Sequence, residues 1–574
     1  MQPACHSYEP NPRYAAVGGG VAVGWDQPVA RLPDPPLVLA VDGPALLDWD
    51  AVVDALCRAL AARGAPTQRL DLRSWFAPWP QVLRATASPA LLDDPHFDRL
   101  AGGDLADLLG ELPPSRRPAA GVLVAFGPAA ALLRPDVLWY VDRPKRFAEA
   151  DVVAGRGHNL GQRPGDGPAT TKRLFYIDWP LLDRHRDTIA ARVDRWFDVQ
   201  VRDRPTSLDG PTMRRTMQAL ARRPFRTRPT FNTTPWGGHW AQRRLGFNPD
   251  GANTALGYEL IAPESGVLVG DADATVELPF QLIVATNPHA VLGRDVHADF
   301  GTSFPIRFDY LDTVGGGNLS VHCHPRPHYM REVFGWPYPQ HETYYLIVGG
   351  DDRQVFLGLR GDSDVSEFDR QARRARDGGA ALDVERYVQV FRADPHQLFC
   401  VPAGTPHGSG AGNVVLEVSA TPYLYSLRFY DWLRHDAEGR QRPVHVEHAF
   451  ANLDTARTGA SVRADLVQPP RTLREGPGWR EELLGALPEM FFEVRRLVLD
   501  GAGGAGDGAL ADDTAGRFHV LNVVEGEGVL IEPAGGTPHR LTYAETIVVP
   551  AAVGAFRVRR VGAQRVRLVK SLVR

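Results

Sequence analysis

Residues 318–325 read Asn-Leu-Ser-Val-His-Cys-His-Pro, and this run sets the interpretation of the second half of the chain. Its apolar and polar residues alternate, which is the pattern of a β-strand with one buried face. Side chains two residues apart lie on one face of a strand, so His322 and His324 are predicted to project together, with backbones roughly 6–7 Å apart. Similar alternation and glycine turns run from about Phe231 to the C-terminus and predict an all-β sandwich or barrel.

Two later positions extend this histidine pair into a possible metal site. Glu342 stands at the head of the strand-like run 343–348, and His407 follows the strand end and turn at 401–406. A lone histidine on a strand is more often a packed core residue than a ligand. Two histidines, a carboxylate and a later histidine on β-strands, however, suit a divalent metal ion such as zinc. An open position on such an ion would make the site catalytic.

The first part of the chain has a different pattern, in which short apolar runs alternate with helical stretches. Strands are predicted at Leu37–Val41 and later at 121–126, 137–141 and 174–177, and helices at 48–63 and 181–197. Strands that alternate with helices indicate a parallel sheet covered on both faces. We therefore expect an α/β domain over residues 1–204.

The rest of the chain is predicted to divide into three parts. Residues 205–230 contain several prolines and read as a linker with one short helix. The metal-binding all-β domain would cover 231–467, with a helical insertion at 362–385, and a second all-β domain would cover 468–574. The glycine run 501–508 is expected to be a hairpin loop. In the second domain His519 and His539 have no matching ligand set, so we expect them to be structural.

The loop after the first predicted strand, residues 41–49, is where a phosphate site would lie in an α/β fold. It lacks the glycine pair and the Gly-Lys-Ser/Thr ending of a P-loop. The spacing of strands and helices resembles that of nucleoside and uridine kinases. This resemblance implies a degenerate kinase-like domain without a P-loop.

Composition excludes several classes of protein. The 574 residues carry a formal net charge of -4, without the excess of positive charge typical of a nucleic-acid binder. No run of about 18 uncharged apolar residues predicts a membrane helix, and the polar N-terminus does not resemble a signal peptide. The four cysteines, Cys5, Cys57, Cys323 and Cys400, are too scattered for a disulfide framework. We expect a cytoplasmic protein whose partner is a small molecule rather than a nucleic acid or a membrane.

From Phe231 onward, a series of motifs resembles the class I (cupin-type) mannose-6-phosphate isomerases. These are Pro-Trp-Gly-Gly at 235–238, Asn-Pro-His-Ala-Val-Leu-Gly at 287–293, Pro-Ala-Gly-Thr-Pro-His at 402–407 and Arg-Phe-Tyr-Asp-Trp at 428–432. Each motif is short, but their order over this length is specific. The resemblance implies two cupin jelly-roll domains and an isomerase of sugar phosphates.

The resemblance also implies roles for individual residues. Zinc would be held by His324, Glu342 and His407, with His322 at the position where the family has glutamine. Ser320 matches a serine near the substrate phosphate, and Arg428 matches an arginine that stabilises charge in the transition state. Glu417 is the candidate general base by its position.

The sequence departs from the family at positions that contact substrate. Gln340 replaces a lysine, and no lysine occurs between Lys172 and Lys570 to substitute for it. His341, Arg307 or Arg434 could supply the lost charge. The leading hypothesis is interconversion of mannose 6-phosphate and fructose 6-phosphate. The alternatives are a metal-dependent cupin enzyme acting on a different sugar or sugar phosphate, and a non-catalytic sugar-binding regulator.

Overall fold

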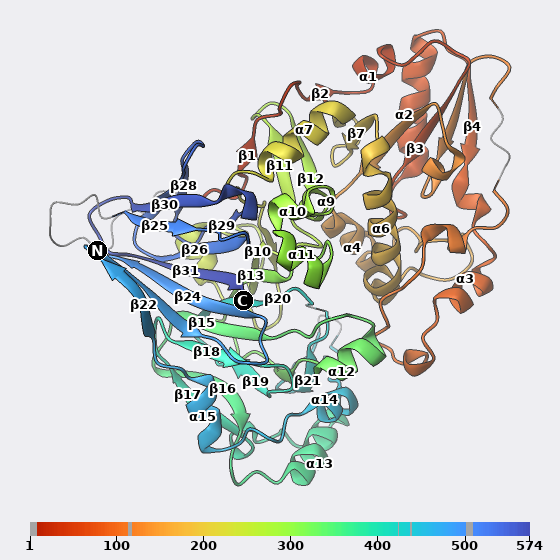
Figure 1. The fold of residues 1–574 in the computed structure, drawn as a ribbon. Helices are drawn as coiled ribbons and strands as arrows, with labels where there is room; N and C mark the ends of the chain where they lie inside the picture. The colour runs from red at the N-terminus through yellow and green to blue at the C-terminus, as the bar shows by residue number, and fades with distance from the viewer. Residues whose placement is uncertain (1–7, 113–116, 423, 437–438, 501–508) are drawn as a thin grey trace.

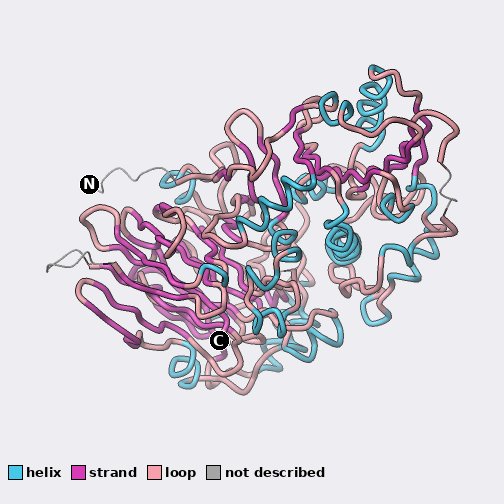
Figure 2. The backbone as a smooth tube through the Cα atoms, turned by 45° about the horizontal axis from the view of Figure 1, so that its top comes forward, coloured by secondary structure: helices cyan, strands magenta, loops and turns pink. Residues whose placement is uncertain are grey.

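The computed structural model describes residues 8–112, 117–422, 424–436, 439–500 and 509–574. It shows a helix-containing N-terminal part and a sheet-rich C-terminal part (Figures 1 and 2). The predicted multidomain, sheet-rich architecture is therefore confirmed. The predicted glycine loop at 501–508 and Cys5 lie outside the described residues. No helix in the described part of the chain is long and apolar enough to cross a membrane.

The N-terminal part is built on a seven-stranded sheet in the order β2-β8-β7-β6-β3-β5-β4. Its strands are β2 (Ala22–Val23), β3 (Leu37–Asp42), β4 (Thr67–Asp71), β5 (Val122–Phe126), β6 (Val137–Asp142), β7 (Arg195–Asp198) and β8 (Thr206–Asp209). Strands β3 to β7 are parallel, as the α/β prediction requires, but β8 and β2 add an antiparallel edge. The sheet is mixed rather than purely parallel.

The described residues of this part form seven α-helices: α1 (Asp26–Ala30), α2 (Trp49–Ala62), α3 (Trp79–Thr86), α4 (Lys145–Val153), α5 (Thr171–Arg173), α6 (Trp179–Ile189) and α7 (Gly210–Leu220). Helix α2 shows why the sequence pattern was informative. The Asp48 carboxylate accepts a hydrogen bond from the Ala51 N–H at the N-terminus, and Gly64 follows the helix with φ +80°. The apolar face of α2, which includes Leu56 and Leu60, is buried against the sheet.

Two of the element predictions were wrong. Residues 174–177 are not a strand but lie in a π-helical turn, η5 (Leu174–Asp178), between α5 and α6. Tyr176 in this turn packs against Tyr425 of the C-terminal part with ring centroids 5.3 Å apart. An apolar run buried on all sides has no periodicity that separates helix from strand. The helix predicted over 181–197 ends at Ile189, because Arg195–Asp198 enter the sheet as β7.

The segment predicted as a linker, 205–230, contains β8 and α7 and leads into β9 (Thr230–Asn232). A small sheet lies next to it, formed by β1 (Arg13–Tyr14), β11 (Gly266–Gly270) and β12 (Thr275–Pro279). The buried Glu277 carboxylate on β12 forms ion pairs of 2.8 Å with Arg146 of α4 and with Arg228. These contacts hold the N-terminal part against the C-terminal part.

The next part is a two-sheet antiparallel sandwich. Its strands are β10 (Leu256–Leu260), β13 (Ile306–Asp312), β14 (Val321–Cys323), β15 (Glu342–Val348), β16 (Gly350–Leu359), β17 (Val388–Ala393), β18 (Leu398–Val401), β19 (His407–Ser409), β20 (Val414–Ala420) and β21 (Leu427–Tyr430). One sheet has the order β18-β15-β20-β13-β10-β9, and the other has β17-β16-β19-β14-β21. Strands β13 to β20 follow the interlocked Greek-key order of an eight-stranded jelly roll.

The C-terminal part repeats this topology. Its strands are β22 (Arg471–Gly476), β23 (Trp479–Gly485), β24 (Phe492–Leu499), β25 (Leu510–Asp513), β26 (His519–Glu525), β27 (Gly528–Pro533), β28 (His539–Thr542), β29 (Thr546–Val549), β30 (Ala555–Arg560) and β31 (Val566–Val573). The sheets have the orders β22-β23-β24-β31-β26-β29 and β25-β30-β27-β28. Strands β24 to β31 therefore form a second eight-stranded jelly roll.

The remaining helices lie in the connections between the strands of the two jelly rolls. They are α8 (Trp240–Leu245), α9 (Phe280–Thr286), α10 (Pro288–Val291), α11 (Arg294–Phe300), α12 (Pro327–Tyr329), α13 (Val365–Arg376), α14 (Val446–Asn452) and α15 (Ala460–Leu466). Within the segment predicted as a helical insertion lies α13, which is followed by the 3₁₀ turn η8 (Val384–Arg386). The other single turns are η1 (Leu72–Trp75), η2 (Pro89–Leu91), η3 (Leu105–Leu108), η4 (Ala130–Leu133), η6 (Ala190–Arg192), η7 (Met330–Phe334) and η9 (Ala551–Val553).

Strand alternation divides the side chains of the first jelly roll between two environments. On β13, Phe308 and Tyr310 project away from the sandwich interior, and the Tyr310 hydroxyl donates to Asn522 of the second jelly roll at 2.7 Å. Phe304, just before β13, packs against Phe518 with centroids 4.2 Å apart. The opposite face of β13, β15 and β20 points into the first jelly roll, where the polar residues gather.

Candidate metal centre

Three strands from both sheets of the first jelly roll bring four predicted side chains together. His322 lies on β14 and His324 just after it, Glu342 begins β15, and His407 begins β19. His322 and His407 are directly opposite in the β14–β19 pairing. One ligand atom from each of the four residues lies within 4.8 Å of the others, and all four are buried. The structure thus places the sequence-predicted ligand set at one point inside the sandwich.

The three imidazole rings are oriented by the backbone around them. In each, Nδ1 lies beside a carbonyl oxygen: His322 beside Ser320 at 2.9 Å, His407 beside Thr405 at 2.9 Å and His324 beside Tyr425 at 3.3 Å. An Nδ1–H that donates to a carbonyl leaves the Nε2 lone pair to face the centre. This is the usual outer arrangement of histidines that bind a metal.

Burial sets the protonation of the site. It lowers the pKa of His322 well below the usual value, and the neighbouring His407 and His324 add to this effect. Burial also lowers the pKa of His324, although Glu342 opposes the shift. Burial alone would raise the pKa of Glu342, but His324 and His407 outweigh it and hold that pKa well below its usual range. Neutral imidazoles around an ionised carboxylate are the forms that bind a metal ion.

The contacts between these groups fit a bound cation. His324 Nε2 is 2.7 Å from Glu342 Oε2, and His407 Nε2 is 3.1 Å from Glu342 Oε1. Glu342 Oε1 and His407 Nε2 are buried and face one another, and neither has a further hydrogen-bond partner among the described residues. Buried atoms of this kind are costly unless something satisfies them. Three imidazole nitrogens and one carboxylate oxygen match the donors that zinc prefers, so these residues can hold a divalent metal ion.

A second polar cluster lies on the same inward face. The buried Arg307 guanidinium donates to Glu417 and, at 2.6 Å, to the Ser419 hydroxyl, and its Nε lies 3.7 Å from Asp309 Oδ1. Burial raises the pKa of Glu417 well above the usual value. The positive charge of Arg307 lowers this pKa, but the negative charges of Asp309 and Glu342 raise it further. Burial likewise raises the pKa of Asp309 to about 6. Glu417 is therefore placed near the ligand set as a carboxyl with a strong affinity for a proton.

Sequence reasoning did not identify Asp309 as part of the site. The signal was present, because Arg307 and Asp309 alternate with apolar residues in the run 306–311, which is the pattern of a strand. Register brings them into the site: Asp309 pairs with Glu417 across β13 and β20, and Glu417 pairs with Tyr344 across β20 and β15. The Tyr344 hydroxyl is buried without a hydrogen-bond partner in the described part of the chain.

The two predicted substrate-binding residues lie next to the ligands. The Gln340 amide donates to Glu342 Oε2 at 3.1 Å, while its carbonyl oxygen is buried without a partner among the described residues. The Ser320 hydroxyl lies 3.4 Å from His322 Nδ1. Both side chains are buried, so any substrate contact would be made inside the sandwich.

Arg428 is placed differently from the other predicted catalytic residue, Glu417. It lies opposite His322 in the β14–β21 pairing, but its guanidinium donates to the Pro443 carbonyl at 3.1 Å. Burial lowers the pKa of Arg428 to about 10, and the nearby Arg442 contributes. Arg434 and Arg442 both form ion pairs with Asp431, at 2.8 and 2.7 Å. Arg428 thus belongs to a group of three arginines around one carboxylate.

The chain resembles known proteins over both of its parts. A family model described as a domain of unknown function (DUF8485) matches residues 24–222. The chain is 25% identical over 261 residues to the "Probable mannose-6-phosphate isomerase GmuF" of Bacillus subtilis (strain 168), covering 45% of this chain and 73% of the relative. It is 22% identical over 338 residues to "Mannose-6-phosphate isomerase ManA" of the same organism, covering 58% of this chain and 95% of the relative. These relatives are named mannose-6-phosphate isomerases.

A solved mannose 6-phosphate isomerase structure from Bacillus subtilis is similar at 20% identity, with a TM-score of 0.48, and covers 61% of this chain and 99% of that one. The family matched over the α/β part carries no named activity, so the resemblance of that part to nucleoside and uridine kinases stays a prediction.

Proposed function

We propose that the first jelly roll is a metal-dependent aldose–ketose isomerase that interconverts mannose 6-phosphate and fructose 6-phosphate. One observation carries the proposal: three histidines and a glutamate present their ligand atoms to a single buried point. The names of the relatives supply the reaction class. In this proposal His322, His324, Glu342 and His407 hold the ion. The ion would supply Lewis-acid stabilisation of the negative charge that develops on the sugar oxygens.

Glu417 is the proposed general base. The reaction moves a proton between C2 and C1 of the sugar, so the base must take the proton from one carbon and return it to the other. Burial raises the pKa of this carboxyl, which strengthens it as a base and favours the removal of the proton from carbon. Arg307 and Ser419 fix the orientation of the Glu417 carboxylate through their hydrogen bonds. Arg307 is therefore a positioning residue in this mechanism.

The phosphate is proposed to be held at the group of three arginines. Arg428, Arg434 and Arg442 bring three positive charges to the single carboxylate of Asp431, which leaves an excess of positive charge. Guanidinium groups bind phosphate oxygens in pairs. Ser320 precedes β14, the strand that pairs with the strand of Arg428, and its hydroxyl is proposed to contact the substrate phosphate.

A second candidate is a metal-dependent enzyme acting on a different sugar or sugar phosphate. The specific observation behind it is Gln340, a neutral side chain that donates to the ligand Glu342 where the resembled family has a lysine. A neutral amide at this place would change which hydroxyl or phosphate oxygen the site accepts.

The experiment is a metal analysis combined with a substrate series. The purified chain is expected to contain about one divalent ion per molecule and to isomerise mannose 6-phosphate faster than mannose or ribose 5-phosphate. Turnover of only another sugar would favour the second candidate. Bound metal without turnover of any sugar or sugar phosphate would contradict both.

A further inference from the structure

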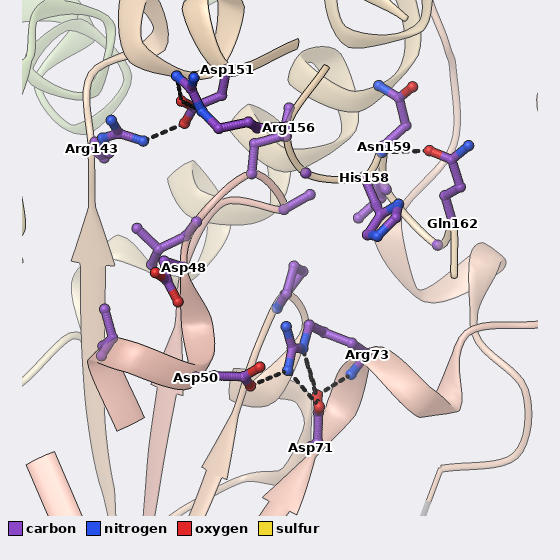
Figure 3. A pocket seen from close by; sticks show the side chains of 18 of the residues that line it. Asp48, Asp50, Asp71, Arg73, Arg143, Asp151, Arg156, His158, Asn159 and Gln162 are labelled. Carbon is purple, nitrogen blue, oxygen red and sulfur yellow. Dashed lines mark hydrogen bonds and ion pairs between the residues drawn. The ribbon is translucent and has the colours of Figure 1, made fainter. Parts of the chain in front are cut away.

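A cavity lies in the N-terminal α/β part, away from the residues of the metal centre. Its volume is about 990 Å³, within the range of small-molecule sites. The lining comes from segments that follow the carboxyl ends of the parallel strands: Asp48 after β3, Asp71 at the end of β4, Arg143 after β6 and Gln200 after β7 (Figure 3). In open α/β sheets, ligands bind outside the carboxyl ends of the strands, so the cavity lies where such a fold places a ligand.

The order of the strands identifies this place further. Strand β3 lies between β5 and β6. The connection after β3 leads to β4 on the β5 side, whereas the connection after β5 crosses past β3 to β6 on the opposite side. This reversal is the topological switch point at which a crevice opens. The loop 43–48 after β3 packs against the loop around Gly157. A Cβ added to Gly157 would lie only 2.4 Å from the Leu46 side chain. These two loops form adjoining walls of the cavity.

One wall is acidic. The Asp48 carboxylate already occupies the N-terminus of α2, where it accepts from the Ala51 N–H at 3.1 Å, and it also pairs with Arg202. A phosphate would be repelled from this helix end. Asp50 and Asp71 lie on the same wall, and both pair with Arg73 at 2.9 and 2.8 Å (Figure 3). Three carboxylates against two guanidiniums give this wall an excess of negative charge.

The opposite wall is basic. Arg143 and Arg156 share the single carboxylate of Asp151, at 2.6 and 2.7 Å (Figure 3). Arg163 donates to the carbonyls of Ser74 and Phe76 at 3.2 and 3.0 Å. These carbonyls are neutral and do not compensate the charge of Arg163, which lies between the two walls beside the segment that follows Asp71. Together with Arg143 and Arg156 it brings three guanidinium groups to the cavity for the one carboxylate of Asp151.

A histidine also lines the cavity. The His158 ring lies beside Asn159 and Gln162 in the cavity lining (Figure 3). Its Nδ1 is shielded from the cavity, so what the basic wall offers an anion is the positive charge of its guanidinium groups.

We propose that this cavity binds a phosphorylated sugar. The phosphate would lie against Arg143, Arg156 and Arg163, since guanidinium groups bind phosphate oxygens with charge-assisted hydrogen bonds. The hydroxyl groups of the sugar would donate to the carboxylates of the acidic wall, which can only accept hydrogen bonds. The chemistry is shared by free sugar phosphates and by nucleotides, and the volume admits either. The site is independent of the metal centre and of its proposed reaction.

The test is calorimetric titration of the full chain with ribose 5-phosphate and with adenosine 5′-monophosphate, each beside its unphosphorylated form. At least one phosphorylated probe is expected to bind with a Kd below about 1 mM. Its unphosphorylated form, ribose or adenosine, is expected to bind at least about tenfold more weakly. The ratio between the two phosphorylated probes distinguishes a sugar phosphate from a nucleotide as the natural ligand.

Two arginine variants assign the binding to the cavity. Arg156→Gln is expected to weaken the binding of the phosphorylated probe about tenfold, because one guanidinium is lost from the basic wall. Its side chain is 64% exposed, so the fold should tolerate the change. Arg58→Gln, an exposed position on α2 outside the cavity lining, is the matched control and should bind as the parent does. Both variants are compared with the parent by melting temperature.

Two results would overturn the proposal: no phosphorylated probe binds, or the probe binds equally well to Arg156→Gln and the parent. A metal-ligand variant separates this proposal from the proposed isomerase. His324→Ala should retain the binding of adenosine 5′-monophosphate while it loses metal. If that variant loses the probe as well, the probe occupies the metal centre and the cavity is not its site.

Discussion

The two jelly rolls have the same strand order but very different interiors. The first encloses His322, His324, Glu342 and His407 and, on the facing strands, the cluster around Arg307. The second encloses an apolar cluster that includes Leu521, Ile531, Leu541 and Phe556. Among its buried charged groups, Lys570 forms ion pairs with Glu481 and Asp512. The same backbone topology therefore supports a polar centre in one copy and a packed core in the other, so function resides in the side chains.

The comparison predicts that metal binding depends on the first jelly roll alone. The double variant His324→Ala, His407→Ala is expected to lose the bound ion, and with it about 1,000-fold or more of any isomerase activity, because two of four ligands are gone. Mass spectrometry of the intact protein measures the metal. His539→Ala in the second jelly roll is the control and should keep the full metal content. A double variant that retains its ion would show that these side chains are not ligands.

Removal of the proposed base should affect turnover without affecting the metal. Glu417→Gln keeps the size of the side chain and its partners Arg307 and Ser419, but the amide cannot accept the proton. We expect kcat to fall by about 100- to 10,000-fold with metal content unchanged. Glu532→Gln, on β27 of the second jelly roll, serves as the matched control. If Glu417→Gln turns over at the parental rate, Glu417 is not the base.

The apolar interior of the second jelly roll should contribute stability rather than activity. Leu521 is fully buried in its core, so Leu521→Ala is expected to lower the free energy of unfolding by about 2–5 kcal/mol. Denaturant titration gives this value, and metal analysis of the same sample should show no change. If the folded variant loses its metal, packing in the second jelly roll affects metal binding in the first, which would contradict the prediction.

Two buried carboxyl groups, one in each interior, should contribute to the pH dependence of stability with opposite signs. In the second jelly roll, burial raises the pKa of Glu481, but Lys570 outweighs it and the pKa falls to about 2. This group stabilises the fold above its unfolded pKa, near 4.5, and the contribution is lost as the pH falls toward 2. Burial raises the pKa of Asp309 to about 6, so its effect runs the other way: stability falls as the pH rises from about 4 to 6.

Two isosteric variants separate these contributions. Glu481→Gln should flatten the stability curve on the acid side, and Asp309→Asn should flatten the fall between about pH 4 and 6. Denaturant midpoints measured at each pH for the chelator-treated protein report both changes. Identical curves for the parent and both variants would contradict the assignments.

The pairing of the candidate ligands His322 and His324 could be predicted because strand alternation and residue type are local properties. His322 and His324 share a face of one strand whatever the rest of the chain does. The helix α2 was also predictable, since its cap at Asp48 and its stop at Gly64 lie at its own ends. The turn at Leu174–Asp178 was not, because an apolar segment buried on all sides carries no period that separates helix from strand.

The sequence by itself determined which residue types could bind a metal and which strands carried them. Only the tertiary structure brought β14, β15 and β19 to one point, placed Asp309 opposite Glu417, and put Arg428 beside Arg434 and Arg442 rather than among the ligands. It also formed the cavity of the α/β part from loops that are far apart in the chain. The physical reason is that these arrangements depend on strand order and register, which are set by long-range packing and are not visible in any local pattern.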